Sequence, residues 1–545
     1  MDLLEGTKGR IELKLEDEGK EEEEEKEEEI SDITKEELIR QLKKLKIVKV
    51  PGEDDIENEA WRYMSKEIRE IFWRLIKNIW RKDGLPEDWN KGIISPIYKK
   101  KKREKRMKIG DKKTEGFWTE KGVRQGCPMS PTLFNIYLMD LEEEMKKEQT
   151  GGVTVGKEKF WTLTYADDIA LLAKSEGDLK GMMKRFKKFI TSKGMILSAE
   201  KSKIIVFENG RGRKKKRKWK WEEESIEEVK EIKYLGCILQ KNGGTEKQVI
   251  ERFKRATVAM KKTWSIGERL FKNDYRRRMK MFDALVGSVA LYGAEIWGWK
   301  NEARLDRIKR KYVKWILGLD RRTPNYILVE ETKMIELRLE AMRRAVKYEE
   351  KASKSEKKLV AECIKDLEKE RMEGKESRWE ATRGVLLKRI GMEKEEIKKK
   401  REEGNKEIVN MVMEKSRNKE KEERQKKISE SRYNSIYKDL ITKDLPKYLC
   451  GKKKRKDRCL IARYRCGNEM KGNQHWRKTD DKICRICENG EENITHVLRE
   501  CQATKSDIQI DEFLSEKGKG LKVMRKIEQE REQARKGKRL ERLNF

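Results

Sequence analysis

The stretch Tyr165-Ala166-Asp167-Asp168, set within residues 160–174, constrains the fold of this chain more than any other feature of its sequence. Apolar and β-prone residues flank the two aspartates in runs of strand length, which predicts two short buried strands joined by a tight turn. A turn can aim adjacent carboxylates at one point in space, whereas a straight strand points them to opposite faces. We therefore expect Asp167 and Asp168 to bind Mg²⁺ at the tip of a hairpin. A solvated Asp-Asp turn is the alternative.

The flanking sequence favours the metal site over the solvated turn. Upstream stand residues 122–131, which read Gly-Val-Arg-Gln-Gly-Cys-Pro-Met-Ser-Pro, and then the mainly apolar run 132–140. With the Tyr-Ala-Asp-Asp box, these segments resemble the palm of reverse transcriptases, and more narrowly the polymerase part of non-LTR (LINE-type) retrotransposon proteins. The resemblance runs with interruptions from Ile33 to Cys501. It implies an α+β fold: a right-hand polymerase palm remnant with an antiparallel sheet and helices, a helical thumb, long charged helices and a small C-terminal zinc knuckle.

The resemblance also implies roles for individual residues. An intact site of this family joins the primer hydroxyl to the α-phosphate of a deoxynucleotide at two Mg²⁺ ions. Asp167 and Asp168 would be catalytic metal ligands, and Lys201 would donate a proton to the leaving pyrophosphate. The residues implied to contact the RNA template or the incoming nucleotide are Arg124, Gln125, Gly126, Pro128, Ser130, Tyr165 and Ala166. Those implied to form the primer grip are Tyr234, Leu235 and Gly236.

One expected part of the palm is missing from the sequence. In the family a long segment follows the position of Tyr98 and holds a further catalytic aspartate on an apolar strand. Here the interval 99–121 has 23 residues, of which eleven are Lys or Arg, and its sole aspartate is Asp111. Without a third carboxylate to bridge both ions, we expect little or no polymerase activity. A real deletion and a gene-model error both account for this gap.

Composition points to a nucleic-acid partner. Only 35% of the residues are hydrophobic and 43% are charged, so we expect a concentrated core, mostly between residues 60 and 330. The 136 Lys and Arg against 101 Asp and Glu give a net charge of +35, which favours polyanions such as RNA and a DNA primer or target. No signal peptide and no apolar run of about 18 residues is present, which predicts an intracellular, nuclear protein without a membrane partner.

These features divide the chain into eight regions. In order, we expect an acidic disordered tail (1–30), a fingers remnant (31–98), a basic linker (99–121), the palm or reverse transcriptase domain (122–240), a helical thumb (241–334), a charged helical region (335–440), a Cys/His zinc-knuckle region (441–505) and a charged tail of helix or disorder (506–545). The first thirty residues are too few to house the endonuclease domain that such elements usually carry.

Two further features bear on ligands. The basic run 211–218 precedes Trp219 and Trp221, which suggests a nucleic-acid contact or a nuclear localisation patch, with a solvated loop as the alternative. Near the C-terminus, a C-x-x-C pair is followed by a histidine and a further cysteine. Three thiolates and one imidazole complete a tetrahedral Zn²⁺ shell, so we expect a structural zinc site. Its ligands would be Cys484, Cys487, His496 and Cys501.

Three functions remain open at this point. The leading interpretation is the RNA-directed DNA polymerase (reverse transcriptase) domain protein of a non-LTR retrotransposon, catalytically impaired as written. The second is a non-catalytic RNA- or DNA-binding remnant of such an element, and the third is a charged helical interaction protein. Primer extension separates the first from the others, and salt-sensitive nucleic-acid binding separates the second from the third. Whether the chain is an enzyme therefore stays open in the sequence.

Overall fold

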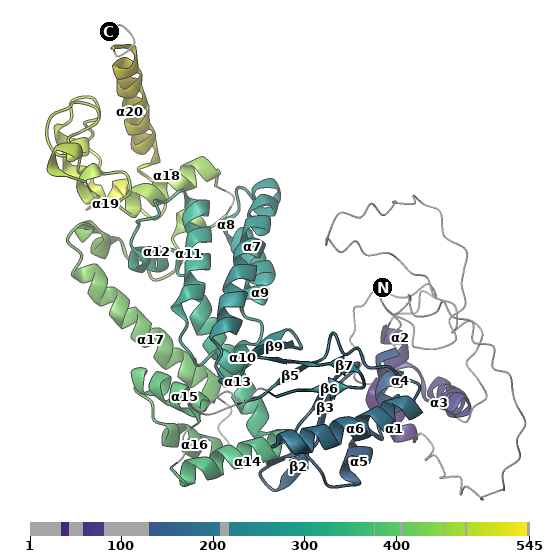
Figure 1. Ribbon diagram of the computed structural model, residues 1–545. Helices are drawn as coiled ribbons and strands as arrows, with labels where there is room; N and C mark the ends of the chain where they lie inside the picture. Colours follow the sequence, from purple (N-terminus) through teal and green to yellow (C-terminus); the bar gives the residue numbers. More distant parts are fainter. Residues whose placement is uncertain are drawn as a thin grey trace, which may run out of the picture. The chain divides into compact units, whose positions relative to one another are not determined.

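The computed structural model describes residues 34–42, 58–80, 130–207, 217–374, 377–403, 407–451, 453–474 and 477–541 (Figure 1). The chain forms two compact units, one of residues 1–143 with 164–169 and the other of residues 144–163 with 170–545. Helices predominate among the described residues, and the strands form only small sheets. The predicted acidic tail, the basic linker at 99–121 and most of the block at 122–131 lie outside the described residues.

The first unit is built on short amphipathic helices. Leu38, Phe72 and Ile76 are buried at its centre, where Leu133 packs against them. The rings of Trp61 and Phe72 lie 5.1 Å apart between centroids. Its helices are α1 (Lys35–Leu42), α2 (Asn58–Tyr63), α3 (Lys66–Trp80) and α4 (Ser130–Tyr137).

The strands of the described residues pair two by two. Four of the pairs are formed by strands that are consecutive along the chain, whereas β5 pairs with β8, and this pair is parallel. The strands are β1 (Val153–Val155), β2 (Glu158–Phe160), β3 (Thr162–Tyr165), β4 (Asp168–Leu171), β5 (Lys203–Ile205), β6 (Lys220–Trp221), β7 (Glu224–Ser225), β8 (Glu227–Val229), β9 (Glu231–Tyr234) and β10 (Cys237–Gln240). The predicted antiparallel sheet is therefore seen only in part: the described strands form small two-stranded sheets, and the β5–β8 pair is parallel.

Helices dominate the second unit beyond the strands. Before the thumb region come α5 (Leu141–Lys146) and α6 (Glu176–Ser192). In the predicted thumb, helices are joined by short turns and loops. They are α7 (Glu246–Leu270), α8 (Tyr275–Phe282), η2 (Asp283–Gly287), α9 (Ser288–Ala290), α10 (Ala294–Trp297), α11 (Ala303–Leu317) and α12 (Asn325–Thr332). Helices α7 and α11 pack side by side (Figure 1).

The charged region is also helical, as its periodicity predicts. Its apolar residues form a separate core cluster in which Val346, Leu387 and Val412 are buried, while most of the charged side chains lie outside it. The elements are α13 (Leu337–Ser353), α14 (Lys358–Met372), α15 (Arg378–Arg389), α16 (Lys394–Glu402), α17 (Ile408–Ser429) and η3 (Ser435–Leu440). The C-terminal elements are η4 (Lys447–Leu449), α18 (Arg455–Arg465), η5 (Lys471–Asn473), η6 (Thr479–Lys482), η7 (His496–Glu500), α19 (Ile510–Phe513) and α20 (Leu521–Glu541).

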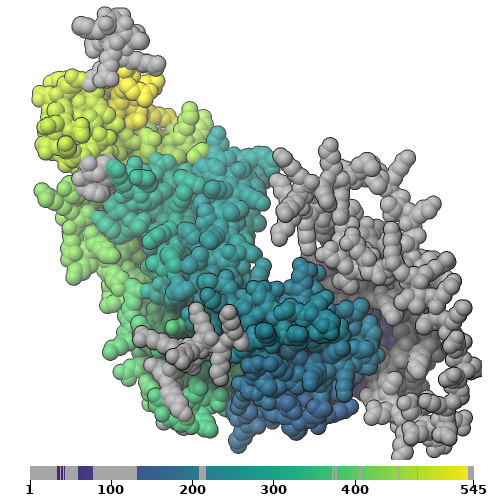
Figure 2. All heavy atoms as spheres, viewed as in Figure 1, coloured from purple at the N-terminus to yellow at the C-terminus, as the bar shows by residue number. Residues whose placement is uncertain are grey.

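The main core lies further along the chain than the sequence suggests. It extends from Val249 in α7 to Ile527 in α20, and both of these side chains are fully buried. The expectation of a core mostly between residues 60 and 330 is therefore wrong. Phe513 and Met524 belong to this core although they follow residue 506, because sparse apolar residues on charged helices still meet when the helices pack. In the space-filling view the C-terminal segments adjoin the teal thumb helices (Figure 2).

Candidate catalytic hairpin and Cys3His metal centre

The aspartate pair lies at the tip of a hairpin, as the sequence predicts. Strand β3 ends at Tyr165 and β4 begins at Asp168, so Ala166 and Asp167 form a two-residue turn. Ala166 has a φ of +50°, a conformation that costs a residue with a β-carbon about 1–2 kcal/mol. Such strain persists only where the surrounding structure enforces it, and it is concentrated at functional sites. Asp167 is therefore in the turn itself, and Asp168 follows it as the first residue of β4.

The strands of this hairpin are less buried than predicted. Tyr165 is 64% exposed, and Asp167 and Asp168 are exposed as well. The prediction of buried strands is wrong because, among the described residues, β3 and β4 pair only with each other and leave their edges open. The base of the hairpin is anchored by Trp161, which is 4% exposed and donates from Nε1 to the Thr150 carbonyl at 3.2 Å.

The remaining sequence-predicted polymerase residues fall in three places. Arg124, Gln125, Gly126 and Pro128 lie outside the described residues, whereas Ser130 is the first residue of α4. Lys201 lies in an exposed turn before β5, in the unit that does not contain the two aspartates.

The predicted primer grip is a second two-residue hairpin. Tyr234 pairs with Cys237, and both Leu235 and Gly236 have positive φ, the combination found in type I′ turns. The Tyr292 hydroxyl donates to the Leu235 carbonyl at 2.5 Å, and Arg252 donates from Nη2 to the Gly236 carbonyl at 3.2 Å. Helix α7 and Tyr292, which lies between α9 and α10, therefore hold this turn from the thumb side.

Trp219 and Trp221 do not form the aromatic contact surface that the basic run suggests. Trp219 is 3% exposed and Trp221 is 9% exposed. The indole Nε1 of Trp219 donates to Glu228 at 3.0 Å, and the ring of Trp221 lies 6.1 Å from that of Phe186 in α6. Both side chains are thus core residues, because the β6–β7 hairpin packs onto the apolar face of α6.

The predicted zinc ligands converge. Cys484, Cys487, His496 and Cys501 each offer a ligand atom, and these atoms all lie within 4.8 Å of one another. A tetrahedral zinc with Zn–S bonds of about 2.3 Å places its sulfur ligands about 3.8 Å apart, so the spacing suits this ion. The Cys487 Sγ and His496 Nε2 atoms are 3.3 Å apart. The sequence prediction of a four-ligand cluster is confirmed.

Local structure brings the two halves of this centre together. The Cys484 amide donates to the Gly490 carbonyl at 3.0 Å, which closes the turn that holds Cys484 and Cys487. Gly490 has a φ of +74°, and a β-carbon there would lie 3.1 Å from His496 Nδ1, so glycine suits both the turn and the close approach. The second half is η7, which runs from His496, where the Asn493 side chain accepts from the His496 amide at 2.8 Å.

The electrostatics of the cluster favour a cation. Cys484 and Cys501 are almost fully buried, and His496 is 5% exposed. Burial raises the pKa of Cys484 to about 11, so a thiolate there is unfavourable unless a positive ion binds it. Three thiolates and an imidazole are the donors that Zn²⁺ prefers, and four protein ligands leave no open position for substrate. The residues fit a structural zinc ion.

The residues around these ligands were not predicted from the sequence. His496 Nδ1 lies 3.0 Å from Glu500 Oε2, the carboxylate–histidine pair that orients a metal ligand, and the i,i+4 spacing on a helix was a usable signal. Arg485, between the two cysteines, donates from Nε to Glu492 at 2.8 Å, and Arg531 of α20 donates to the same carboxylate at 2.6 Å. No sequence pattern links Arg531 to the knuckle, since 39 residues separate it from Glu492.

Comparison with known families identifies the class of the hairpin-bearing region. Residues 66–239 match the family model described as reverse transcriptase (RNA-dependent DNA polymerase), a range that includes both aspartates and the predicted primer grip. The chain therefore carries a reverse transcriptase domain.

The relatives that the chain resembles are proteins of the retrotransposable element R2 and of the mobile element jockey. A Pol polyprotein from a type-1 retrotransposable element R2 of Popillia japonica is 27% identical over 154 residues, 27% of this chain and 24% of that protein. The corresponding R2 protein of Nasonia vitripennis is 31% identical over 140 residues, 25% of this chain and 13% of that protein. An RNA-directed DNA polymerase from the mobile element jockey of Drosophila melanogaster is 24% identical over 196 residues, 34% of this chain and 20% of that protein. The matched parts span at most about a quarter of these relatives.

No helix in the described ranges is both long and apolar enough to cross a membrane.

Proposed function

We propose that this protein is the polymerase part of a non-LTR retrotransposon protein that binds an RNA template and a DNA primer or target in the nucleus, and that its catalysis is impaired. The observation that carries the proposal is the exposed Asp167-Asp168 tip within the family-matched range 66–239. Exposure of the tip gives a primer end, a deoxynucleotide and Mg²⁺ access to both carboxylates. The proposed contacts of Arg124, Gln125, Gly126, Pro128 and Ser130 with template and nucleotide complete this assignment.

The impairment follows from the number of carboxylates. Two-metal phosphoryl transfer needs ligands for two ions about 3.5–4 Å apart, and Asp167 and Asp168 alone leave one ion poorly held. The interval 99–121, where the family places a third carboxylate, has only Asp111 among eleven basic residues. We expect that the chain binds primer and template but extends the primer at a rate near background.

The Cys3His centre supports the same assignment. Four protein ligands would fill the coordination shell of zinc, which gives the ion a structural role: it would hold the turn at Cys484–Cys487 against η7. Ile494, Val497 and Leu498 of this segment belong to the main core, so zinc and the core together would hold its polar surface in place. In the proposed function this knuckle holds a nucleic-acid-binding surface in place and takes no part in phosphoryl transfer.

Primer extension on an RNA template with Mg²⁺ tests the catalytic part of the proposal. The wild-type chain and Asp167→Asn are expected to extend equally and near background. Glu223→Gln, which alters an exposed carboxylate in the turn between β6 and β7, is the matched control. Robust Mg²⁺-dependent extension that Asp167→Asn abolishes and Glu223→Gln spares would show that the site is complete and the impairment wrong.

Binding of a primer–template hybrid tests the other part. The net charge of +35 predicts a dissociation constant that rises steeply with salt, because each neutralised phosphate releases counterions. Absence of salt-dependent binding to RNA, DNA or their hybrid would overturn the proposed function altogether.

A second candidate is a retroelement remnant that binds nucleic acid without any chemistry. The Cys3His centre favours it, because this centre needs no catalytic aspartate to operate. The test is a variant in which a third palm carboxylate has been restored. If this variant binds nucleic acid tightly and in a salt-dependent way but does not extend a primer, the result favours the second candidate over an impaired enzyme.

A further inference from the structure

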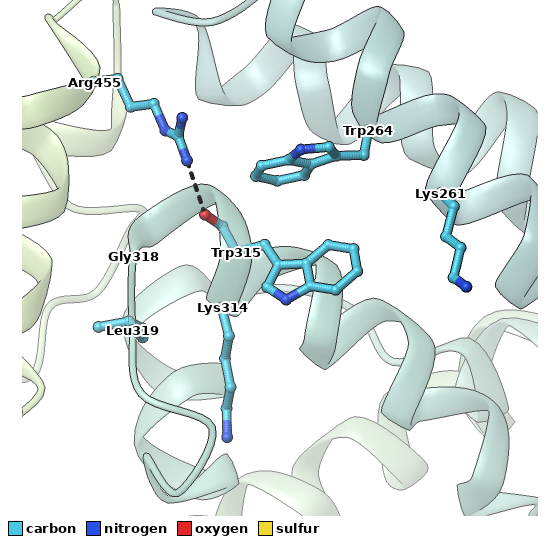
Figure 3. A pocket seen from close by; sticks show the side chains of 7 residues that line it. All are labelled: Lys261, Trp264, Lys314, Trp315, Gly318, Leu319 and Arg455. Atoms are coloured by element: carbon cyan, nitrogen blue, oxygen red, sulfur yellow. Dashed lines mark hydrogen bonds between the residues drawn. The ribbon is translucent and has the colours of Figure 1, made fainter.

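A pocket of about 650 Å³ opens between the thumb helices and α18 (Figure 3). Two tryptophans line it, Trp264 from α7 and Trp315 from α11, and their ring centroids lie 5.4 Å apart at an interplanar angle of 74°. Lys261, Lys314 and Arg455 contribute the charged side chains of its wall. We call this site the tryptophan pocket.

The pocket is built by elements distant in sequence. Helix α11 ends at Leu317, and Gly318 follows with a φ of +62°, so the Leu319 amide donates back to the Lys314 carbonyl at 2.9 Å. This cap turns the chain sharply and leaves Trp315 at the rim. Helix α18 is fixed beside it, because the Arg455 amide donates to the Asn273 side chain at 3.0 Å.

Trp264 and Trp315 are both partly exposed, unlike the aromatic residues packed beside them in the core. Tyr312, one turn before Trp315, is fully buried, and Trp297 is 3% exposed. Trp264 and Trp315 keep part of their rings open to the pocket, although each has buried neighbours in the main core. An open aromatic face in a thumb of closely packed rings is an available stacking surface.

Positive charge surrounds these faces. The Lys311 Nζ atom lies 4.9 Å from the centroid of the Trp315 ring, and the Arg455 guanidinium lies 5.4 Å from that of Trp264. Lys261 and Lys311 are exposed, whereas Arg455 also pairs with Glu268 at 2.8 Å. Among the described residues that line the pocket, none is acidic. A ligand with flat rings and negative charges complements this arrangement.

We propose that the tryptophan pocket binds a segment of single-stranded nucleic acid, with a base stacked on Trp315 and backbone phosphates held by Lys261 and Lys311. This inference rests on the proposed function for the class of partner, but it requires neither Mg²⁺ nor the Asp167-Asp168 tip. Aromatic stacking accepts any base, so the contact is independent of sequence. It gives the protein a second hold on a strand, separate from the catalytic hairpin.

The test measures binding of a fluorescein-labelled oligothymidylate to the full-length, zinc-loaded protein. Loss of one stacked base predicts that Trp315→Ala raises the dissociation constant at least fivefold, whereas Trp315→Phe, which keeps an aromatic face, restores most of the affinity. The double variant Lys261→Glu/Lys311→Glu should also lower the slope of log K against log salt by about one to one and a half.

The matched control is Lys262→Glu/Lys280→Glu. It makes the same change in net charge at exposed lysines of α7 and α8, whereas Lys261 lines the pocket and Lys311 lies over the ring of Trp315. Equal weakening by the two double variants, or full affinity in Trp315→Ala, would overturn the inference. So would binding of polyglutamate as tight as that of oligothymidylate, since this would identify an acidic protein segment as the occupant.

Crosslinking locates the contact directly. Oligothymidylate carrying 4-thiothymidine should crosslink to the peptides that contain Trp264 or Trp315, and crosslinks confined to other segments would contradict the inference. Failure of this contact is distinguishable from failure of the proposed function. If the protein binds a primer–template hybrid and the pocket variants do not change oligothymidylate binding, only the pocket inference is contradicted. If it binds oligothymidylate through the pocket but binds no hybrid, only the polymerase assignment is contradicted.

Discussion

Glu500→Gln should weaken zinc binding although Glu500 is not a ligand. Glu500 lies one helical turn after His496, and its Oε2 atom is 3.0 Å from His496 Nδ1. A carboxylate there fixes the proton on Nδ1, so Nε2 is free to face Cys487, 3.3 Å away. A neutral amide keeps the shape of the side chain but removes the negative charge that pairs with the imidazole.

The structure sets the size of this effect. Outer-shell partners of metal-bound histidines typically contribute about 10- to 100-fold in affinity. The Glu500 side chain is 63% exposed, so water screens its charge and the lower end of this range applies. We expect about a tenfold loss of zinc affinity, which corresponds to about 1.4 kcal/mol.

Competition of the protein with a chromogenic zinc chelator at constant pH measures this affinity. The matched control is Glu491→Gln, the same chemical change in the same segment, at a carboxylate whose ion pair is with Lys482 at 3.8 Å. Cys487→Ala, which removes a ligand, should lose far more affinity than either. An unchanged affinity in Glu500→Gln, or an equal loss in Glu491→Gln, would refute the role of the carboxylate–histidine pair.

Three further predictions concern buried charge and backbone strain. Glu331→Ala should reduce the free energy of unfolding in urea by about 3–5 kcal/mol, because it leaves the Arg465 charge without its partner at a site that is 1% exposed. In the wild type the Arg465 Nε lies 2.6 Å from the Glu331 carboxylate. A loss below about 1 kcal/mol would contradict this prediction. Burial, reinforced by the Glu336 charge, raises the pKa of Asp306 from 3.8 to about 7. The folded state therefore binds this proton more tightly than the unfolded state, so the free energy of unfolding rises as pH falls from about 7 to about 4. Asp306→Asn should remove up to about 4 kcal/mol of that gain, and an unchanged difference in unfolding free energy between pH 7 and pH 5 would contradict it. Ala166→Gly should strengthen the hydrogen-exchange protection of β3 and β4 by up to about 1 kcal/mol, because glycine adopts the positive φ without a β-carbon penalty. Ala166→Val should weaken this protection, and equal protection in both variants would show that the positive φ is not strained.

Buried ionic clusters illustrate what the sequence left undetermined. Glu331 of α12 accepts from Tyr437 and Tyr448 as well as from Arg465, at 2.9 and 2.8 Å for the two tyrosines. The sequence does not distinguish Glu331 and Arg465 from solvated charges, because charge patterning alone gives every lysine, arginine and glutamate the same environment. Only the packing of α12 against η3, η4 and α18 removes this set from water.

The aspartate hairpin and the Cys3His cluster could be predicted from the sequence, because short-range backbone geometry determines both. A two-residue turn between strand-forming runs places Asp167 and Asp168 at a tip, and a C-x-x-C turn followed by His and Cys brings four ligands together. In both cases fewer than twenty residues and their allowed backbone angles suffice. The family resemblance added the chemistry expected at the tip.

Only the tertiary structure determines which of the tryptophan side chains are buried and which are exposed. Trp219 and Trp221 follow a basic run and are core residues, whereas Trp264 and Trp315, also beside lysines, line an open pocket. Both pairs of tryptophans have lysines as neighbours in the sequence, so the local composition does not indicate which pair is buried. Exposure depends on which elements cover a ring: α6 covers the first pair, while the second lies where α7, α11 and α18 meet without filling the space between them.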